Sequence, residues 1–285
     1  MNKKQVQATL AQLNLKPKKS LGQNFLINPS ILSKIVSEAN LSKEDIIVEV
    51  GTGLGALTIE LSSRVKKIYS YEIDFKLFRY ASKNLSFLNN IKLIHEDILR
   101  ADLPYHNKIV SNIPYTITGP LFEKIFYNDR PPEGVLIIEK SIADRIFNLE
   151  IYKKFSRISV TFNAFMKPLK KLNISPKSFY PQPKVELSLI KVKAREKVNP
   201  FLLEKEKRSF FLDFIAGIMP YKNKNIVNAL ELYLKNRTSI LIPKIELLVF
   251  MKDNNIKDTK LFELNVDDLV ELSAKTFNFL KQKVN

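Results

Sequence analysis

The sequence contains no cysteine, only two histidines and only seven glycines among its 285 residues. Without cysteine the chain has no disulfide, no thiolate nucleophile and no cysteine-bound metal. Two histidines, His95 and His106, are too few for a typical zinc site, so we expect no metal. No apolar run approaches the ~20 residues that span a bilayer, and the N-terminus lacks the apolar core of a signal peptide. We therefore expect a soluble, cytoplasmic protein that does not bind membranes.

Acidic residues are scarce relative to basic ones: 29 Asp and Glu stand against 46 Lys and Arg, a formal net charge of +17. Such an excess attracts phosphate polyanions, so nucleic acid is the natural partner, with general lysine richness as the alternative explanation. The distribution favours a binding face. Residues 1–20 hold five Lys and no acid, and residues 151–190 hold eight Lys or Arg against Glu186 alone.

Short apolar runs alternate with helical stretches from Ile46 onward, which predicts an α/β fold with a parallel sheet covered on both faces. The five expected strands are 46–50, 67–71, 91–95, 108–111 and 134–139. The helices between them are expected at 57–63, 75–87, 119–127 and 141–149. Two further strands are expected at 158–165 and 185–192, the second of which can return antiparallel.

The remaining segments differ in character from this core. Residues 1–19 are predicted to be a mobile basic arm with at most a short helix, followed by a helix that Asn28 caps and Pro29 begins. After residue 194 only helical spacing remains, at 201–219, 225–235, 244–252 and 266–281, with Asn265 as a cap. The expected division is an arm over 1–19, a catalytic domain over 20–194 and a small all-helical domain over 195–285.

The segment from Val48 to Thr58 places Gly51, Gly53 and Gly55 where a strand turns into a helix. Glycines there permit a tight turn and let a ligand approach the backbone, while the helix N–H groups face polar atoms. Gly51-x-Gly53-x-x-Ala56 fits a dinucleotide site and an S-adenosylmethionine site equally well.

Two carboxylates and one amide then follow successive strands. Glu72 can accept both hydroxyls of a ribose, and Asp97 can accept an adenine amino hydrogen, at the strand ends where open α/β sheets bind ligands. Asn112, in the run Ser111-Asn112-Ile113-Pro114-Tyr115, can accept one hydrogen of a target amine. A main-chain carbonyl near Ile113–Pro114 can accept the other, so that the nitrogen lone pair is exposed, and catalysis consists of positioning and polarisation. Pro114 restricts the backbone of this turn, and Tyr115 offers a ring on which a base can stack.

Together these motifs resemble the small-subunit ribosomal RNA adenine N6,N6-dimethyltransferases, most closely their archaeal members. The resemblance runs from Lys18 to the last helix. Its markers are Ser20-Leu21-Gly22-Gln23-Asn24-Phe25-Leu26, Val48–Gly55, Tyr71-Glu72-Ile73-Asp74, His95-Glu96-Asp97, Asn112-Ile113-Pro114-Tyr115 and Phe179-Tyr180-Pro181-Gln182-Pro183-Lys184-Val185.

The resemblance implies a Rossmann-like S-adenosylmethionine-dependent methyltransferase sheet with a small helical C-terminal domain. It implies that the cofactor is held by Asn24, Leu26, Gly51, Gly53, Glu72, Asp97 and Asn112. It also implies that Phe179 sandwiches a flipped adenine opposite Tyr115, because a base removed from its stack needs replacement stacking. The implied substrate is ribosomal RNA within an immature small subunit, bound by a monomer.

Basic residues close to the expected strand at 158–165 are predicted to contact the RNA phosphates. The predicted contacts are Lys153, Lys154, Arg157 and Lys170, together with the N-terminal arm. In that region the chain departs from the family, since it has Phe155-Ser156-Arg157 where relatives carry a glycine.

Four other functions remain open on the sequence. A large-subunit rRNA adenine methyltransferase of the macrolide-resistance type would share the glycine loop and the Asn-Ile-Pro-Tyr run. A non-catalytic transcription or ribosome-assembly factor would share the fold, although intact Glu72, Asp97 and Asn112 argue against it. A nicotinamide-dependent oxidoreductase would need a hydride-transfer acid or base, for which we find no candidate. A DNA adenine methyltransferase would normally carry a separate base-reading domain.

Overall fold

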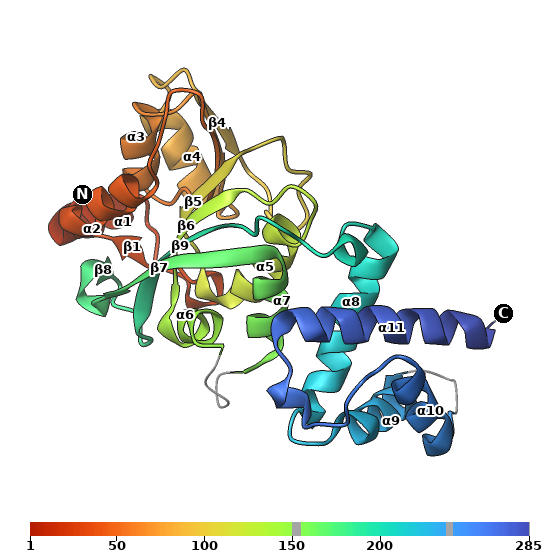
Figure 1. Cartoon of the computed structure of the whole chain (residues 1–285). Coiled ribbons are helices and arrows are strands. Elements are labelled where there is room, and N and C mark those ends of the chain that lie inside the picture. The colour runs from red at the N-terminus through yellow and green to blue at the C-terminus, as the bar shows by residue number, and fades with distance from the viewer. Residues whose placement is uncertain (150–154, 238–241, 285) are drawn as a thin grey trace. The chain divides into compact units, whose positions relative to one another are not determined.

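The computed structural model describes residues 1–149, 155–237 and 242–284, which fold into two compact units (Figure 1). The first unit comprises residues 1–126, 130–144 and 167–194. The second comprises residues 127–129, 145–166 and 195–285, so it takes in a segment from the middle of the chain as well as the C-terminal region. Within the described residues, no helix combines the length and apolarity that a bilayer crossing requires.

A seven-stranded sheet forms the centre of the first unit, in the order β4-β3-β2-β5-β6-β9-β7. The first five strands in this order are parallel, and β9 runs antiparallel to β6. The strands are β2 (Ile46–Val50), β3 (Lys67–Tyr71), β4 (Ile91–Ile94), β5 (Lys108–Asn112), β6 (Glu133–Glu139), β7 (Met166–Ile174) and β9 (Leu187–Ala194). The predicted α/β fold and the antiparallel return are therefore confirmed.

In the first unit, helices connect successive parallel strands. Most residues of β2, β5 and β6 are buried. Ile47, Ile68 and Val110 of three strands are at most 1% exposed in one apolar cluster, and burial of such side chains drives the packing. The helices are α1 (Lys3–Gln12), α2 (Pro29–Glu38), α3 (Ala56–Ser62), α4 (Phe75–Asn84), α5 (Thr118–Phe126) and α6 (Lys140–Phe147), the last of which extends into the second unit. Helix α2 begins as predicted, with the Asn28 side chain accepting a hydrogen bond from the Ser30 N–H.

A second, two-stranded sheet joins distant parts of the chain. Strand β1 (Phe25–Leu26) pairs antiparallel with β8 (Phe179–Tyr180), so that Leu26 lies opposite Phe179. This pairing brings two of the family-like segments side by side, although residues 20–26 and 179–185 are about 150 positions apart in the sequence.

The N-terminal segment is docked on the first unit. Val6 and Leu10 of α1 are buried in an apolar cluster with Leu54 and Leu77. The prediction of a mobile arm is wrong for residues 3–12, because the apolar residues of its short helix have partners on the domain.

The regular secondary structure in the described part of the second unit is helical, apart from an isolated bridge between Asn225 and Lys260. Its helices are α7 (Arg157–Phe165), α8 (Lys205–Ile218), α9 (Ile226–Arg237), α10 (Lys244–Asp253) and α11 (Val266–Val284). Asn265 accepts a hydrogen bond from the Asp268 N–H at 2.9 Å, which confirms the predicted cap.

The predicted strand at 158–165 is wrong, since these residues form α7. Every residue from Ser159 to Phe165 is buried, and the polar residues Ser159, Thr161 and Asn163 alternate with apolar ones, a period of two that imitates a strand. The strand follows this helix: β7 occupies the Lys-rich stretch between the two strands expected at 158–165 and 185–192. It is an edge strand in which Lys167 and Lys170 are exposed, and charges on an edge strand discourage pairing with other chains.

Candidate active site

The ends of the parallel strands surround one cavity of about 200 Å³ within the first unit. Its wall is built from the segment 20–26, the glycine loop after β2, the turns after β3 and β4, and the turn after β5. The residues of these segments that the sequence analysis assigned to cofactor binding all line it: Asn24, Leu26, Gly51, Gly53, Glu72, Asp97 and Asn112. The structure therefore brings all seven together.

The glycine loop adopts a conformation that other residues rarely reach. Gly51 has φ of 78° and Gly53 has φ of 55°, both in the left-handed region that favours glycine. The Gly51 N–H donates to the Tyr71 carbonyl at 2.8 Å, which ties the loop to the end of β3. The loop consequently presents backbone, with no side chain at these two positions, to the cavity.

Glu72 is buried and already holds two backbone groups. Its Oε2 accepts from the Gly53 N–H at 2.9 Å, and its Oε1 accepts from the Asp74 N–H at 2.8 Å. Burial raises the pKa of Glu72, and these two N–H donors oppose the rise. A carboxylate has about four lone-pair sites, so acceptor capacity remains on both oxygens.

Asp97 lies after β4 on a more open part of the wall. Its Oδ1 accepts from the Leu99 N–H at 3.0 Å, and its side chain is 32% exposed. Arg100 is 4.0 Å away at its closest nitrogen. The carboxylate is thus held in place by its own turn while keeping access to the cavity.

Asn112 is the last residue of β5. The NH₂ group of its side-chain amide has a hydrogen-bond partner, whereas the amide oxygen has none among the described residues. Its Nδ2 donates to the Asn24 carbonyl at 3.0 Å, and because a carbonyl can only accept, this contact fixes the orientation of the amide. Its Oδ1 is buried and has no hydrogen-bond partner among the described residues. An orphaned buried acceptor is costly, so this oxygen is suited to a ligand that brings a donor.

The segment before β1 touches the Asn-Ile-Pro-Tyr turn directly. Gly22 has φ of 61°, and a Cβ added there would lie 3.1 Å from Pro114 Cβ. Asn24 Nδ2 donates to the Gly22 carbonyl at 3.1 Å, which fixes the curve of the segment. A glycine is needed at position 22 for both reasons: its backbone angle and its close approach to Pro114.

Tyr115 and Phe179 are brought into the same apolar cluster, and among the described residues they lie behind the cavity wall, not on it. Phe179 is 2% exposed. The Tyr115 hydroxyl is buried without a hydrogen-bond partner, and burial, with the nearby Glu139 charge, raises the pKa of Tyr115. The stacking role of the two rings stays a prediction.

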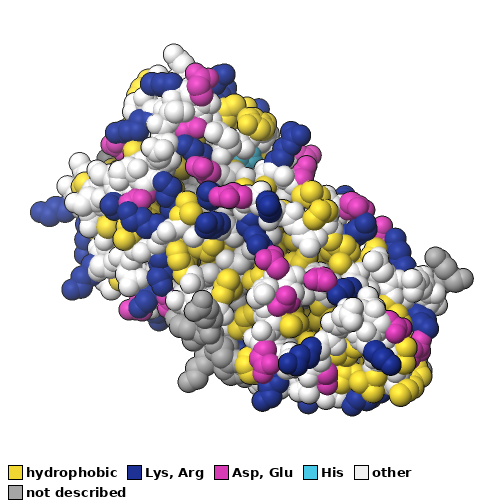
Figure 2. All heavy atoms as spheres, in the orientation of Figure 1, with side chains coloured by type: hydrophobic (Ala, Val, Ile, Leu, Met, Phe, Trp, Pro, Cys, Tyr) yellow, Lys and Arg dark blue, Asp and Glu magenta, His cyan; other side chains and the backbone are white. Residues whose placement is uncertain are grey.

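Two of the four predicted RNA contacts are among the described residues, one in each unit. Lys153 and Lys154 lie outside the described residues. Arg157 is exposed at the start of α7 in the second unit, whereas Lys170 is exposed on β7 in the first unit. Lys170 donates to Glu38 at 2.6 Å, and Figure 2 shows Lys and Arg interspersed with Asp and Glu over the visible face.

Several residues of the site were not singled out from the sequence. Glu49 lines the cavity from β2 and is 1% exposed, and its Oε2 accepts from Thr58 Oγ1 and Ser70 Oγ at 2.7 Å each. Met1 and Val6 of the N-terminal segment also line the cavity. Glu49 stands inside the glycine motif and could have been found there; nothing in the sequence pairs residues 1–6 with this wall.

Comparisons with known proteins agree with this geometry. The model of the family described as ribosomal RNA adenine dimethylase matches residues 14–265. The ribosomal RNA small subunit methyltransferase A of Caldanaerobacter subterraneus is 36% identical over 226 residues, covering 76% of this chain and 83% of that protein. The protein of the same name from Listeria monocytogenes is 30% identical over 282 residues, covering 93% and 92%. These relatives are bacterial, and closeness to archaeal members stays a prediction.

Solved structures share the fold. A dimethyladenosine transferase from Plasmodium falciparum superposes with a TM-score of 0.75 at 24% identity, covering 91% of this chain and 98% of that one. The 23S rRNA methyltransferase ErmE superposes with a TM-score of 0.61 at 21% identity, covering 88% and 99%. Since the family model spans most of the sequence and the curated relatives cover most of their own length, this chain belongs to the ribosomal RNA adenine dimethylase family.

Proposed function

We propose that the chain transfers methyl groups from S-adenosylmethionine to the N6 amines of adjacent adenosines near the 3′ end of small-subunit ribosomal RNA. Membership of the dimethylase family supports adenine dimethylation, and the small-subunit names of the relatives support the target RNA. The observation that carries the chemistry is the buried, partnerless Oδ1 of Asn112 on the wall of the cavity.

The residues of the cavity fit the proposed methyl donor. Glu72 offers carboxylate acceptors for ribose hydroxyls, and Asp97 offers one for an adenine amino group. Gly51 and Gly53 leave room for the ligand against bare backbone. When bound, the donor supplies a methyl group on a positively charged sulfur.

Asn112 would prepare the target amine. An adenine amine is a weak nucleophile because its lone pair is delocalised into the ring, and two well-placed acceptors localise that lone pair. Oδ1 of Asn112 is the first acceptor; a carbonyl of Ile113 or Pro114 is the second, the Pro114 oxygen already accepting from the Ile117 N–H at 3.1 Å. Because the Asn112 amide is fixed before substrate arrives, little reorganisation accompanies the reaction.

Tyr115 and Phe179 would hold the base between their rings once it leaves its stack. Their common apolar cluster supports this role, and Leu26, which packs against the same cluster, is paired with Phe179 between β1 and β8. The hydroxyl of Tyr115 has no partner to lose when the ring moves.

The partners follow from the same assignment. We infer that a monomer acts in the cytoplasm on an immature small ribosomal subunit, and that Arg157, Lys170 and the segment containing Lys153 and Lys154 contact the RNA phosphates. The net charge of +17 supports a polyanionic substrate.

The test is incubation of the protein with labelled S-adenosylmethionine and either naked small-subunit RNA or unmethylated small-subunit particles, followed by mapping of the methylated nucleotides. We expect two adjacent dimethylated adenosines, with particles preferred. Asn112→Ala should fold normally and lose at least about 100-fold in turnover, because one preorganised acceptor is removed. Near-wild-type turnover in that variant, or label confined to large-subunit RNA, would refute the proposal.

A further inference from the structure

Asp74 is a buried acid whose two oxygens have different partners. The residue is 3% exposed. Its Oδ1 accepts from the N–H groups of Lys76 at 3.0 Å and Leu77 at 3.4 Å, which caps helix α4. Capping requires only one acceptor oxygen. The second oxygen is therefore available for a separate role.

That second oxygen holds a segment from more than 50 residues earlier in the chain. Lys18 Nζ donates to Asp74 Oδ2 at 2.8 Å, and Gln23 Nε2 donates to it at 3.2 Å. Gln23 Oε1 in turn accepts from the Lys18 N–H at 2.7 Å. Burial alone would raise the pKa of Asp74, but the hydrogen bonds from Lys18 and Gln23 bring it below the ordinary value. We call residues 14–24 the strap segment; it is tied to the start of α4.

Asp74 is also bonded to the carboxylate proposed to hold the ribose. The Asp74 N–H donates to Glu72 Oε1, and the other oxygen of Glu72 accepts from the Gly53 N–H. One hydrogen-bonded chain therefore runs from the strap segment through Asp74 and Glu72 to the glycine loop. Gln23, Glu72 and Gly53 all line the cavity, so this chain follows its wall.

The other end of the strap segment reaches the proposed catalytic amide. The Asn24 carbonyl accepts from Asn112 Nδ2 at 3.0 Å. Gln23 and Asn24 are consecutive, so a shift of Gln23 moves the carbonyl that orients Asn112. The strap segment is thus held by Asp74 on one side of the cavity and by Asn112 on the other.

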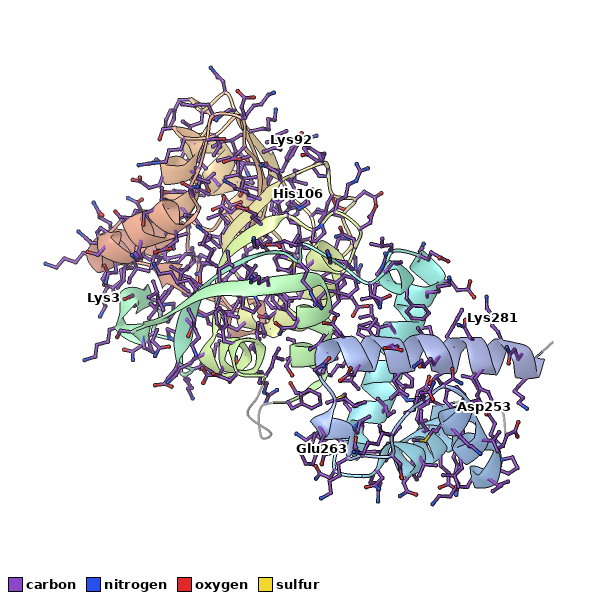
Figure 3. All side chains as sticks on the ribbon, viewed as in Figure 1. Lys3, Lys92, His106, Asp253, Glu263 and Lys281 are labelled. Atoms are coloured by element: carbon purple, nitrogen blue, oxygen red, sulfur yellow. The ribbon has the colours of Figure 1, made fainter. Side chains whose placement is uncertain are left out.

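The helix before the strap segment adds apolar surface to the same wall. Met1 and Val6 line the cavity, and Lys76 Nζ donates to the Asn14 carbonyl at 3.0 Å. Lys3, labelled in Figure 3, belongs to this helix. Its Nζ lies 5.8 Å from the centre of the Tyr180 ring on β8. The first turn of α4 consequently anchors the N-terminal region at Asn14 as well as at Lys18.

We infer that Asp74 is a positioning residue of the methyl-donor site. Through Lys18 and Gln23 it holds the strap segment against the cavity, and it thereby sets both how tightly the donor is retained and how the Asn112 amide is oriented. The inference rests on the proposed function, which makes this cavity the donor site.

Two substitutions separate this role from helix capping. Asp74→Asn keeps a side-chain oxygen to cap α4, but it offers Lys18 and Gln23 an uncharged group with one acceptor fewer. Lys18→Met removes the ammonium and keeps the apolar stem. Lys66→Met is the matched control, because Lys66 is 62% exposed in a surface pair with Glu44 and Lys18 is 56% exposed.

The first readout is the Kd for S-adenosylhomocysteine, measured by calorimetry on the full chain. We expect Asp74→Asn and Lys18→Met each to weaken binding roughly tenfold, the usual effect of losing a hydrogen bond to a charged group. The double variant should bind no more weakly than the weaker-binding single variant, because both substitutions remove the same interaction between Lys18 and Asp74. Lys66→Met should bind within twofold of wild type. If Asp74→Asn does not fold, Lys18→Met carries the test by itself.

The second readout distinguishes positioning from stability. We expect KM for S-adenosylmethionine to rise more than kcat falls, and Asn112 Nδ2 resonances to shift in Asp74→Asn. A lowered melting temperature of the ligand-free variants with an unchanged Kd would overturn the inference, since Asp74 would then only cap α4. Failure of the wild-type protein to bind S-adenosylhomocysteine would instead refute the proposed function.

Discussion

Glu49 gives the strongest prediction of pH-dependent stability. Burial raises the pKa of this carboxyl from 4.5 to about 7, with a smaller contribution from the Glu72 charge, while the Thr58 and Ser70 hydroxyls oppose the rise. A carboxyl whose pKa is raised in the folded state contributes stability that is complete below the unfolded pKa and is lost as the pH rises through the folded pKa. The window is therefore about pH 4.5 to 7.

Glu49→Gln tests this shift directly. The glutamine retains an oxygen that accepts from Thr58 and Ser70 but carries no charge at any pH. A shift of this size corresponds to about 3 kcal/mol at 1.36 kcal/mol per unit. We expect the stability of Glu49→Gln relative to wild type to increase by about 3 kcal/mol between pH 4.5 and pH 8.5. Any cost of the new NH₂ group is constant with pH and cancels from this difference.

The assay is urea unfolding at several pH values, followed by far-UV circular dichroism because the chain contains no tryptophan. Carboxyl-carbon NMR of labelled Glu49 should show a midpoint near 7 in the same preparation. Glu38→Gln is a control of opposite sign below about pH 4.5, since Lys170 and Lys34 lower the pKa of Glu38 from 4.5 and its contribution is lost only as the pH falls below that value. A stability difference between Glu49→Gln and wild type that stays flat from pH 4.5 to 8.5 would refute the reasoning.

Two further predictions concern the base and the RNA. Tyr115→Phe should raise the free energy of unfolding by about 1 kcal/mol, because it removes a buried hydroxyl that has no partner among the described residues. Tyr127→Phe should lower the free energy of unfolding by a similar amount, because the Tyr127 hydroxyl bonds to Thr161 Oγ1 at 3.1 Å. Chemical denaturation checks both variants, and changes of the same sign would contradict the argument. Lys170→Gln and Arg157→Gln should each weaken binding to small-subunit RNA and leave the Kd for S-adenosylhomocysteine unchanged. Each should also reduce the slope of log binding constant against log salt concentration by about 1. A slope equal to that of Lys66→Gln would show that these residues do not contact the RNA.

The centre of the sheet was predictable from the sequence because its inner strands are largely buried. Runs such as Ile46–Val50, apolar except for Glu49, are bounded by turn residues and alternate with helical stretches. Sequence pattern failed at Arg157–Phe165, where a largely buried helix carries polar and apolar residues in alternation, as a strand does. It failed in the opposite sense at β7, where an edge strand carries lysines and a proline that are typical of a loop.

The seven residues proposed to hold the cofactor were predictable from the sequence, but their hydrogen bonds were not. Position at the strand ends and similarity to a family indicated Glu72, Asp97 and Asn112. Neither source indicates that the Asn112 amide is oriented by the Asn24 carbonyl, or that Asp74 bonds to the strap segment. Those contacts join residues 50 to 90 positions apart, and only the folded chain defines them.

The pairing of β1 with β8 has a consequence for the order in which this protein becomes competent during synthesis. Leu26 faces the cavity and is held opposite Phe179, so that wall stays incomplete until residue 180 has left the ribosome. A fragment ending near residue 150 would contain the glycine loop, Glu72, Asp97 and Asn112, yet it would lack the strand that secures Leu26. We therefore expect a chain halfway through translation to lack a complete cavity, even though every polar group of the proposed site has by then been made.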